Sequence, residues 1–235
     1  MSLNKQNGNM YGFITYTWNP LAGECSHDCV YCSTKALMRY PVIKAKYSGK
    51  PRLVESCLKD NLGSGNFIFV CAQNDLFAKD VDRHHIWSIL DKCDKFPDNT
   101  YLFQSKNPSR FKYHLDDLPR HSLLGTTIES NRSYPYVSNA PLAQYRASEM
   151  AELYKQGHKT MVTIEPILDF DLPELVELVE MCRPEWVNIG ADSKGNDLPE
   201  PDKGKVDMLE MVLSERGLKV LPKGNLNRLD RRHET

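Results

Sequence analysis

The sequence lacks any long apolar run and any marked excess of charge of one sign. None of its 235 residues belongs to a run long enough to span a membrane. No apolar leader precedes Asn19, so we expect a cytoplasmic protein without membrane contact. Lys and Arg number 30 against 31 Asp and Glu, a formal net charge of −1. No global field therefore draws the chain to nucleic acid, although a local basic patch could still do so.

A paired cysteine pattern is also missing. Seven cysteines are an odd number, which disfavours a disulfide-stapled secreted fold and favours reduced thiols in the cytoplasm. Cys57, Cys71, Cys93 and Cys182 stand singly, with no ligand spacing between them, so a second metal centre is not expected. We expect Cys57 and Cys93 to be packing residues of helices, whereas Cys71 ends a strand and could face a site.

The other three cysteines share one short polar loop, residues 25–32, which reads CSHDCVYC. A [4Fe–4S] cluster normally takes four cysteine ligands. Cys25, Cys29 and Cys32 would leave one iron free to bind a molecule that is not protein. Two other interpretations stay open. One is a structural zinc site, for which His27 is a poor fourth ligand; the other is three buried thiols without metal, which the polar loop disfavours.

Strand-like and helix-like segments alternate about six times along the chain. Such alternation is typical of parallel strands joined by right-handed crossovers. A full eight-unit barrel usually needs about 250 residues. We therefore expect one α/β domain over residues 1–235, built as a partial (βα)6 TIM-like barrel, with residues 1–10 and about 224–235 peripheral or flexible.

The elements that we expect follow from apolar periodicity and from turn residues. The predicted strands are 13–17, 67–71, 100–104, 123–128, 160–164, 186–190 and a short 219–221. The predicted helices are 34–40, 51–62, 83–96, one with Ala147, Met150, Ala151 and Tyr154 on its buried face, 171–182 and 206–213. We expect residues 41–50 to be irregular and Asp171 with Glu174 to form a capping box.

The carboxyl ends of parallel barrel strands meet at one mouth, where such folds carry their chemistry. Placed by their strands alone, the segments expected there are the cysteine loop, 72–77, Lys106, 127–130, Glu165 and 190–193. We also expect Arg110 to face this mouth.

These residues resemble the radical S-adenosylmethionine (SAM) superfamily, whose signature is C-x3-C-x2-C with an aromatic residue, here Tyr31, directly before the third cysteine. Four more segments are similar in type and order to the compact radical SAM proteins often carried by phages and prophages. They are TWNP at 17–20, NDLF at 74–77, QSKNP at 104–108 and IEPIL at 164–168. The resemblance spans most of the chain and implies a partial barrel of the radical SAM type.

The resemblance further implies an enzyme in which Cys25, Cys29 and Cys32 hold a [4Fe–4S] cluster and SAM binds the free iron. One electron, from a donor such as flavodoxin or ferredoxin, would cleave SAM to methionine and a 5′-deoxyadenosyl radical. The radical would abstract a substrate hydrogen. The reaction subtype, whether isomerase, lyase or oxidoreductase, stays open.

Strand-end residues then become candidates for binding SAM. We expect Tyr31 near adenine, and Gly190 and Ala191 as a small-residue strand end that lets the base approach closely. Asn74 and Asp75 are candidates for the SAM amino group. Candidates for the ribose hydroxyls or the methionine carboxylate are Thr127, Glu129 and Ser130.

Glu165 and Lys106 are the candidate catalytic side chains. Glu165 could hold SAM or touch substrate, and Lys106 could hold phosphate. For Glu165 and Asp75 a structural ion pair or loop cap is the alternative. The phage-type resemblance suggests a nucleotide or a DNA base as substrate, with three aromatic side chains available for stacking. They are Trp18, Tyr134 and Tyr136.

Two further functions stay open beside this one. The protein could be a non-catalytic iron–sulfur redox sensor or regulator, or a radical SAM enzyme that acts on a small metabolite. We expect a monomer in each case.

Overall fold

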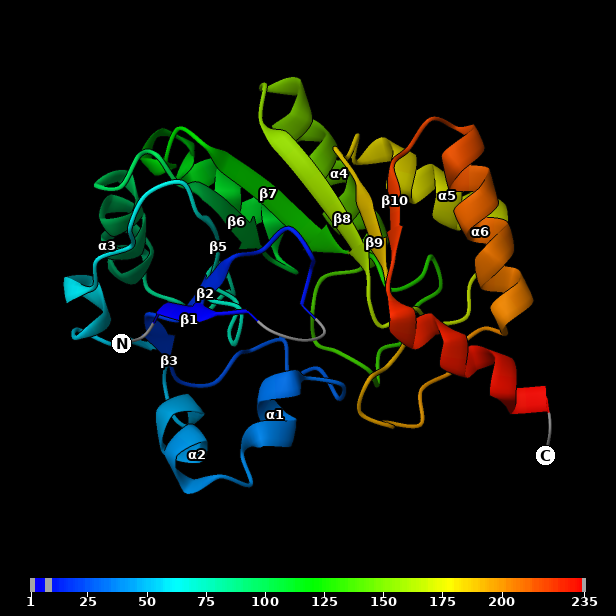
Figure 1. Cartoon of the computed structure of the whole chain (residues 1–235), viewed down its shortest axis with the longest axis horizontal. Coiled ribbons are helices and arrows are strands. Elements are labelled where there is room, and N and C mark those ends of the chain that lie inside the picture. Colours follow the sequence, from blue (N-terminus) through cyan, green and yellow to red (C-terminus); the bar gives the residue numbers. More distant parts are fainter. Residues whose placement is uncertain (1–2, 7–9, 234–235) are drawn as a thin grey trace.

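The computed structural model describes residues 3–6 and 10–233. One open sheet of eight strands runs through it, and every neighbouring pair except β1 with β2 is parallel (Figure 1). The predicted α/β partial barrel is therefore confirmed. In order across the sheet the strands are β1 (Leu3–Lys5), β2 (Tyr16–Trp18), β5 (Phe67–Val70), β6 (Thr100–Gln104), β7 (Ser122–Thr127), β8 (Lys159–Ile164), β9 (Val187–Ile189) and β10 (Val220–Pro222).

Helices join most of the successive strands, 3-10 segments alone join β6 to β7, and one more 3-10 segment follows β10. The α-helices are α1 (Ser33–Leu37), α2 (Pro41–Tyr47), α3 (Arg83–Asp94), α4 (Ala143–Lys155), α5 (Leu172–Met181) and α6 (Lys203–Glu215). The 3-10 turns are η1 (Cys57–Lys59), η2 (Pro108–Tyr113), η3 (Leu115–Asp117) and η4 (Gly224–His233). In Figure 1, α1 and α2 lie below the sheet, apart from the helices that cover it.

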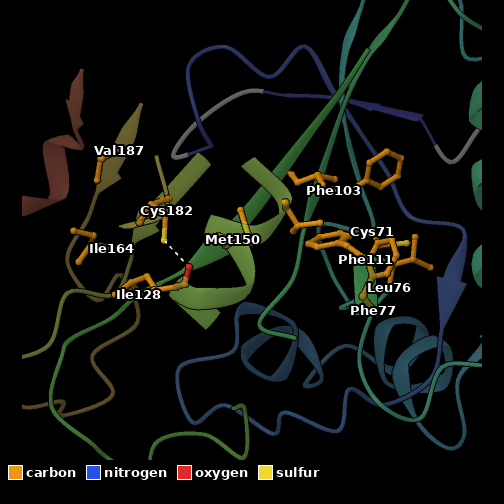
Figure 2. Packing of buried hydrophobic residues seen from close by; sticks show 14 of the residues in the cluster. Cys71, Leu76, Phe77, Phe103, Phe111, Ile128, Met150, Ile164, Cys182 and Val187 are labelled. Atoms are coloured by element: carbon orange, nitrogen blue, oxygen red, sulfur yellow. Dashed lines mark hydrogen bonds between the residues drawn. The ribbon is translucent and has the colours of Figure 1, made fainter. Parts of the chain in front are cut away.

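The main apolar layer fills the space between the strands and helices α3 to α6. Figure 2 shows Met150 of α4 in the middle of this layer, between Phe103 on one side and Ile164 on the other. Cys182 lies in the same layer, and its thiol donates to the carbonyl of Leu178 at 3.3 Å. The expectation that Cys57 and Cys93 are packing residues is confirmed, since both are buried here.

A second, smaller apolar cluster fills the inside of the open barrel. Phe69 and Met161 point into it from the strands, and Tyr11 and Ile14 reach it from the segment before β2. The ring of Phe13 packs edge-on against Trp186 with centroids 4.8 Å apart. The chain between residues 10 and 14 therefore closes part of the barrel with side chains rather than with a strand.

This packing corrects the prediction of a strand at 13–17. The strand begins only at Tyr16, because Phe13 and Ile14 turn into the barrel interior. At the edge of the sheet, β1 pairs antiparallel with β2, from Leu3 opposite Trp18 to Lys5 opposite Tyr16.

The predicted helix over 51–62 is wrong. Arg52 and Leu53 form strand β4, which pairs antiparallel with β3 (Leu21–Ala22), and the amide of Val54 donates to the carbonyl of Pro20 at 2.8 Å. Cys57 and Leu62 of this segment are buried, Leu53, Val54 and Leu58 are partly buried against the core, and only the turn η1 is helical. Backbone groups that bond to β3 are not available for a helical ladder.

The predicted irregular stretch 41–50 is also wrong, because it contains α2. Pro41 occupies the first turn of this helix, where a missing amide hydrogen costs nothing. The expected capping box fails for a different reason. Asp171 precedes α5 without a side-chain cap, since its carboxylate binds the guanidinium of Arg132.

Parts of both terminal segments contact the rest of the fold. Leu226 and Leu229 of η4 are buried in the main apolar layer, and β1 belongs to the sheet. Residues 1–2, 7–9 and 234–235 lie outside the described part of the chain. No helix within the described residues has both the length and the apolar content to cross a bilayer.

Candidate functional site

The carboxyl ends of the parallel strands open into a cavity of about 490 Å³. The loops after β5, β6, β8 and β9 all reach it, as the barrel geometry predicts. Its lining includes the predicted residues Cys25, Cys29, Tyr31, Cys32, Asn74, Asp75, Lys106, Thr127, Glu165 and Ala191.

All three cysteines of the loop 25–32 line this one cavity. Cys29 is buried, with its sulfur 3.2 Å from the hydroxyl of Ser138, and Cys25 and Cys32 are partly exposed. Burial, followed by the charge of Asp75, raises the pKa of Cys25 to about 12. Among the described residues, no three His, Cys, Asp or Glu side chains are grouped closely enough to hold one metal ion. Cys71 also lines the cavity, at a positive φ of 58°.

A buried pair holds the cysteine loop against the strand that follows it. His27 Nε2 lies 2.9 Å from Asp75 Oδ2, and both residues are buried. The same oxygen accepts from the amide of Lys106 at 2.8 Å, while Oδ1 accepts from the amide of Phe77 at 2.9 Å. Burial acts to raise the pKa of Asp75, but His27 and these hydrogen bonds outweigh it and lower the pKa. Asp75 thus ties three segments together.

Asn74 fixes the other end of the loop. Its Nδ2 donates to the carbonyl of Gly23 at 2.8 Å, just before the first cysteine, and its Oδ1 accepts from the amide of Asp75 at 2.8 Å. From α1, the hydroxyl of Thr34 donates to the carbonyl of Gln73 at 2.7 Å. The loop after β5 is therefore hydrogen-bonded to the chain both before and after the cysteine loop. Asn74 and Asp75, the candidates for the SAM amino group, already make these protein hydrogen bonds.

A second buried network surrounds Glu129 at the end of β7. Its carboxylate accepts from the hydroxyl of Tyr31 and from Arg146 Nη2, the latter at 2.7 Å, and lies 3.7 Å from Lys106 Nζ. Burial would raise the pKa of Glu129, but Arg146 and Lys106 outweigh it and lower the pKa to about 2. Lys106 also lies 5.3 Å from the Tyr31 ring centroid and donates to Thr127 Oγ1 at 3.1 Å. The network fixes the aromatic residue of the cysteine motif.

Arg146 is the member of this network that the sequence did not predict. It comes from α4, whose buried face is Ala143, Arg146, Ala147, Met150 and Leu153. The predicted buried face included Tyr154, which is exposed. The prediction was therefore rotated by part of a helical turn from the observed buried face. The available signal was a lone arginine at helical spacing among apolar residues.

Glu165, the candidate catalytic residue after β8, is paired with Lys223 after β10 at 2.8 Å. The same ammonium lies 4.9 Å from the ring centroid of Tyr11. A Cβ at Gly190 would lie 2.9 Å from Glu165 Cδ. The glycine therefore makes room for Glu165, whereas the sequence suggested that it makes room for adenine.

Three predicted residues do not line the main cavity. Glu129 and Ser130 line a neighbouring cavity of about 60 Å³, and Ser130 donates to the carbonyl of Asp169 at 2.7 Å. Gly190 lies behind Glu165. Glu129 and Gly190 still adjoin residues that line the main cavity, Tyr31 and Glu165.

Two other predictions are wrong. Arg110 does not face the mouth, since its guanidinium donates to the carbonyls of Ala78 and Val81. Trp18 is not available for stacking, because it is fully buried and its Nε1 donates to Asp60 at 3.2 Å. Tyr136 is 67% exposed and stays a candidate.

Solved structures share this fold at low sequence identity. A variant of spore photoproduct lyase matches with a TM-score of 0.61 and 11% identity, over 92% of this chain and 78% of that one. Another variant, with bound AdoMet and dinucleoside spore photoproduct, matches with a TM-score of 0.55 and 12% identity, over 88% of this chain but only 63% of that one.

Streptococcus suis SuiB bound to S-adenosylmethionine matches with a TM-score of 0.59 and 11% identity, over 93% of this chain and 52% of that one. This chain thus spans about half to three quarters of the length of these structures. At such identities the likeness is one of fold, and it agrees with the partial barrel of the radical SAM type predicted from the sequence.

No protein of curated function matches the chain. A family model covers residues 10–200, which include the cysteine loop and every strand from β2 to β9. The chain therefore belongs to the family described as "Protein of unknown function (DUF5131)".

Proposed function

We propose that this protein is a radical SAM enzyme that binds a [4Fe–4S] cluster and SAM in the strand-end cavity and acts on a nucleotide or a DNA base. One observation carries the proposal. The three thiols of the C-x3-C-x2-C loop line a single cavity at the carboxyl ends of parallel strands, in a fold shared with structures that contain SAM.

The residues present fit the cluster. Cys25, Cys29 and Cys32 would ligate it. In a cluster each cysteine binds a different iron, so three thiols that face one cavity without meeting at a single point are a suitable donor set. When bound, the cluster would supply the electron that cleaves SAM to methionine and a 5′-deoxyadenosyl radical. The cavity of about 490 Å³ has room for a ligand beside the loop.

The chain's own side chains position this chemistry. His27 and Asp75 fix the cysteine loop, and Glu129 fixes Tyr31 by a hydrogen bond. The apolar cluster around Phe69 and Tyr11 fills the barrel interior next to the cavity and would keep water out of it. Polar side chains that line the mouth, among them Thr127 and Glu165, would orient SAM and substrate, and Ala191 is a small residue of the same lining.

Support for a nucleotide or base as substrate comes from two directions. One structure that shares the fold holds a dinucleoside spore photoproduct. In this chain, Lys106 lines the cavity, where its ammonium could hold a phosphate group, and the exposed Tyr136 lies on the loop that bonds to the cysteine loop through Val137 and Val30. The flanking motifs favour the compact phage-type subgroup.

We place the whole activity in one domain over residues 1–235, acting as a cytoplasmic monomer supplied with electrons by a flavodoxin or ferredoxin. The cavity is formed by elements from both halves of the chain, since Cys25 and Lys223 both line it. This arrangement supports a single folding unit.

Anaerobic reconstitution with iron and sulfide tests the proposal. We expect a brown protein whose reduced form converts SAM to 5′-deoxyadenosine and methionine, measured by chromatography and mass spectrometry. A cluster that forms but leaves SAM intact would support the redox-sensor function instead. Turnover stimulated by a free metabolite and not by nucleotides or DNA would move the substrate to a small molecule.

A further inference from the structure

The chain's charges are balanced overall but not along its length. Residues 33–54, which we call the basic excursion, contain six of the 30 Lys and Arg residues and none of the 31 Asp and Glu residues. They run from α1 through α2 to β4, directly after the cysteine loop. A chain of net charge −1 thus presents one strongly cationic segment beside its candidate active site.

Half of these cations point outward without a counter-charge. Arg39, Lys44 and Lys50 are exposed, and none of the three forms an ion pair within the described part of the chain. The others have structural contacts. Lys46 donates to the carbonyl of Asn19 at 2.9 Å. The remaining two bind near neighbours, Lys35 to Asp28 and Arg52 to the carbonyls of Ala45, Lys46 and Ser48.

An exposed aromatic side chain lies among these cations. Tyr40, between α1 and α2, is 49% exposed, and the guanidinium of Arg39 lies 5.0 Å from its ring centroid. Arg39 Nη2 also donates to the Tyr40 hydroxyl at 3.1 Å, which holds the two planar groups together. Paired planar groups of this kind offer a stacking surface for an unpaired base.

The excursion adjoins the mouth of the cavity. Ser33, Thr34 and Leu37 of α1 line the cavity, while Arg39 follows the same helix on the exposed side. In Figure 1, α1 and α2 lie below the sheet, on the side where the loops after β7 and β9 also lie. A chain bound along the excursion would therefore pass the cavity that holds the cysteines.

We infer that the basic excursion binds the phosphodiester backbone of single-stranded nucleic acid and presents one of its bases to the cavity. The binding stands by itself, whereas a catalytic role for the presented base rests on the proposed function. The exposed cations would hold phosphates, and Tyr40 with Arg39 would stack a base. An anionic membrane is the less suitable occupant. Surface-bound helices present a broad apolar face, whereas α1 and α2 have five and seven residues.

The test measures binding of a fluorescent single-stranded DNA oligonucleotide by anisotropy, at a series of salt concentrations. The triple variant Arg39→Gln, Lys44→Gln, Lys50→Gln should bind at least about tenfold more weakly, and its slope of log K against log salt should be shallower by about 2, since each phosphate contact contributes about 0.7. The single variant Tyr40→Ala should lose about fivefold or more while keeping the slope.

A matched control variant removes the same number of positive charges, one Arg and two Lys, at the opposite end of the strands. Arg120, Lys159 and Lys219 are exposed residues that precede or begin β7, β8 and β10. Their triple glutamine variant should bind the oligonucleotide as the wild type does. Equal losses in the two triple variants would mean a diffuse charge effect and would overturn the assignment.

Two further readouts separate this inference from the proposed function. Substrate-free cleavage of SAM should be unchanged in the excursion variant, since none of its three residues touches the cavity. Sedimentation with phosphatidylserine vesicles tests the membrane alternative, and loss of vesicle binding with intact oligonucleotide binding would overturn the inference. Tight, excursion-dependent DNA binding in a protein that never cleaves SAM would uphold it while the proposed function fails.

Discussion

The layer between sheet and helices and the cavity at the strand ends both contain cysteines, and the two sets behave differently. In the layer, Cys93 and Cys182 are buried among apolar side chains. In the cavity, Cys25 and Cys32 are partly exposed and surrounded by charged and polar groups. The same side chain is a small apolar filler in one region and a candidate ligand in the other. Environment, not residue type, separates them.

The two regions also differ in what holds them together. The layer depends on apolar burial, which tolerates changes of similar volume. Around the cavity, buried carboxylates have specific partners: Asp75 contacts His27, and Glu129 forms an ion pair with Arg146. Removing one partner of such a pair leaves an uncompensated charge. Substitutions at the cavity, each with a matched control outside it, therefore test the difference.

The largest expected contrast is between cysteines. Cys29→Ala should abolish the brown colour after reconstitution and reduce SAM cleavage to background, because one cluster ligand is lost. Cys93→Ala should keep both and lower the free energy of unfolding by on the order of 1 kcal/mol. Absorbance, iron content and 5′-deoxyadenosine yield measure the first effect, and denaturant unfolding the second. Full turnover in Cys29→Ala would remove the mechanism.

The second largest effect, on both stability and iron content, is expected from Asp75→Asn. The substitution keeps the shape but disrupts the contacts of Asp75 Oδ2 with His27 and with the amide of Lys106, at a cost of about 1.5 to 3 kcal/mol for each hydrogen bond to a charged acceptor. It should also lower the iron retained after reconstitution, because the cysteine loop loses its anchor. Asp171→Asn is the control, since its partner Arg132 is on the surface. Unchanged stability and iron content in Asp75→Asn would show that the pair does not hold the loop.

Acid stability tests the Glu129 network. The pKa of Glu129 is lowered from 4.5 to about 2 in the folded state, so its contribution is complete above pH 4.5 and is lost as the pH falls towards 2. Over that window the stability advantage of the wild type over Glu129→Gln should shrink by about 3 kcal/mol. Denaturant unfolding at several pH values measures it, with the exposed Glu152→Gln as control. A constant difference across the window would contradict the prediction.

The smallest expected effect comes from Gly190→Ala. Its new Cβ would displace Glu165 and weaken the pair with Lys223, at a cost of about 1 to 3 kcal/mol. Gly12→Ala is the control, because no atom lies within 4 Å of a Cβ there. Thermal unfolding compares the two. If Gly190→Ala is as stable as Gly12→Ala, the close approach of Glu165 is not a constraint.

Sequence periodicity is sufficient to predict the bounds of an element where that element buries its own apolar face. Strand β6 and helix α3 were found almost to the residue, because the apolar run 100–104 and the Ile86, Ile89, Cys93 spacing are set by local packing. The cavity followed from them, since strand ends fix its location.

The rest depended on contacts between distant segments. The spacing around Cys57 looked helical, yet β3 takes up that backbone. Arg146 faces inward, where Glu129 and the carbonyl of Thr127, on another part of the chain, accept from its guanidinium. Pairings of this kind do not appear in any one window of sequence.

The open barrel has a consequence for how the protein can be handled. Tyr11 and Lys223 come from opposite ends of the chain, yet they meet beside Glu165 within the lining of the cavity. Trimming the chain as far as Tyr11 or Lys223 would therefore remove a side chain from the lining of the candidate site, and fusion partners are best joined through flexible spacers placed beyond these positions.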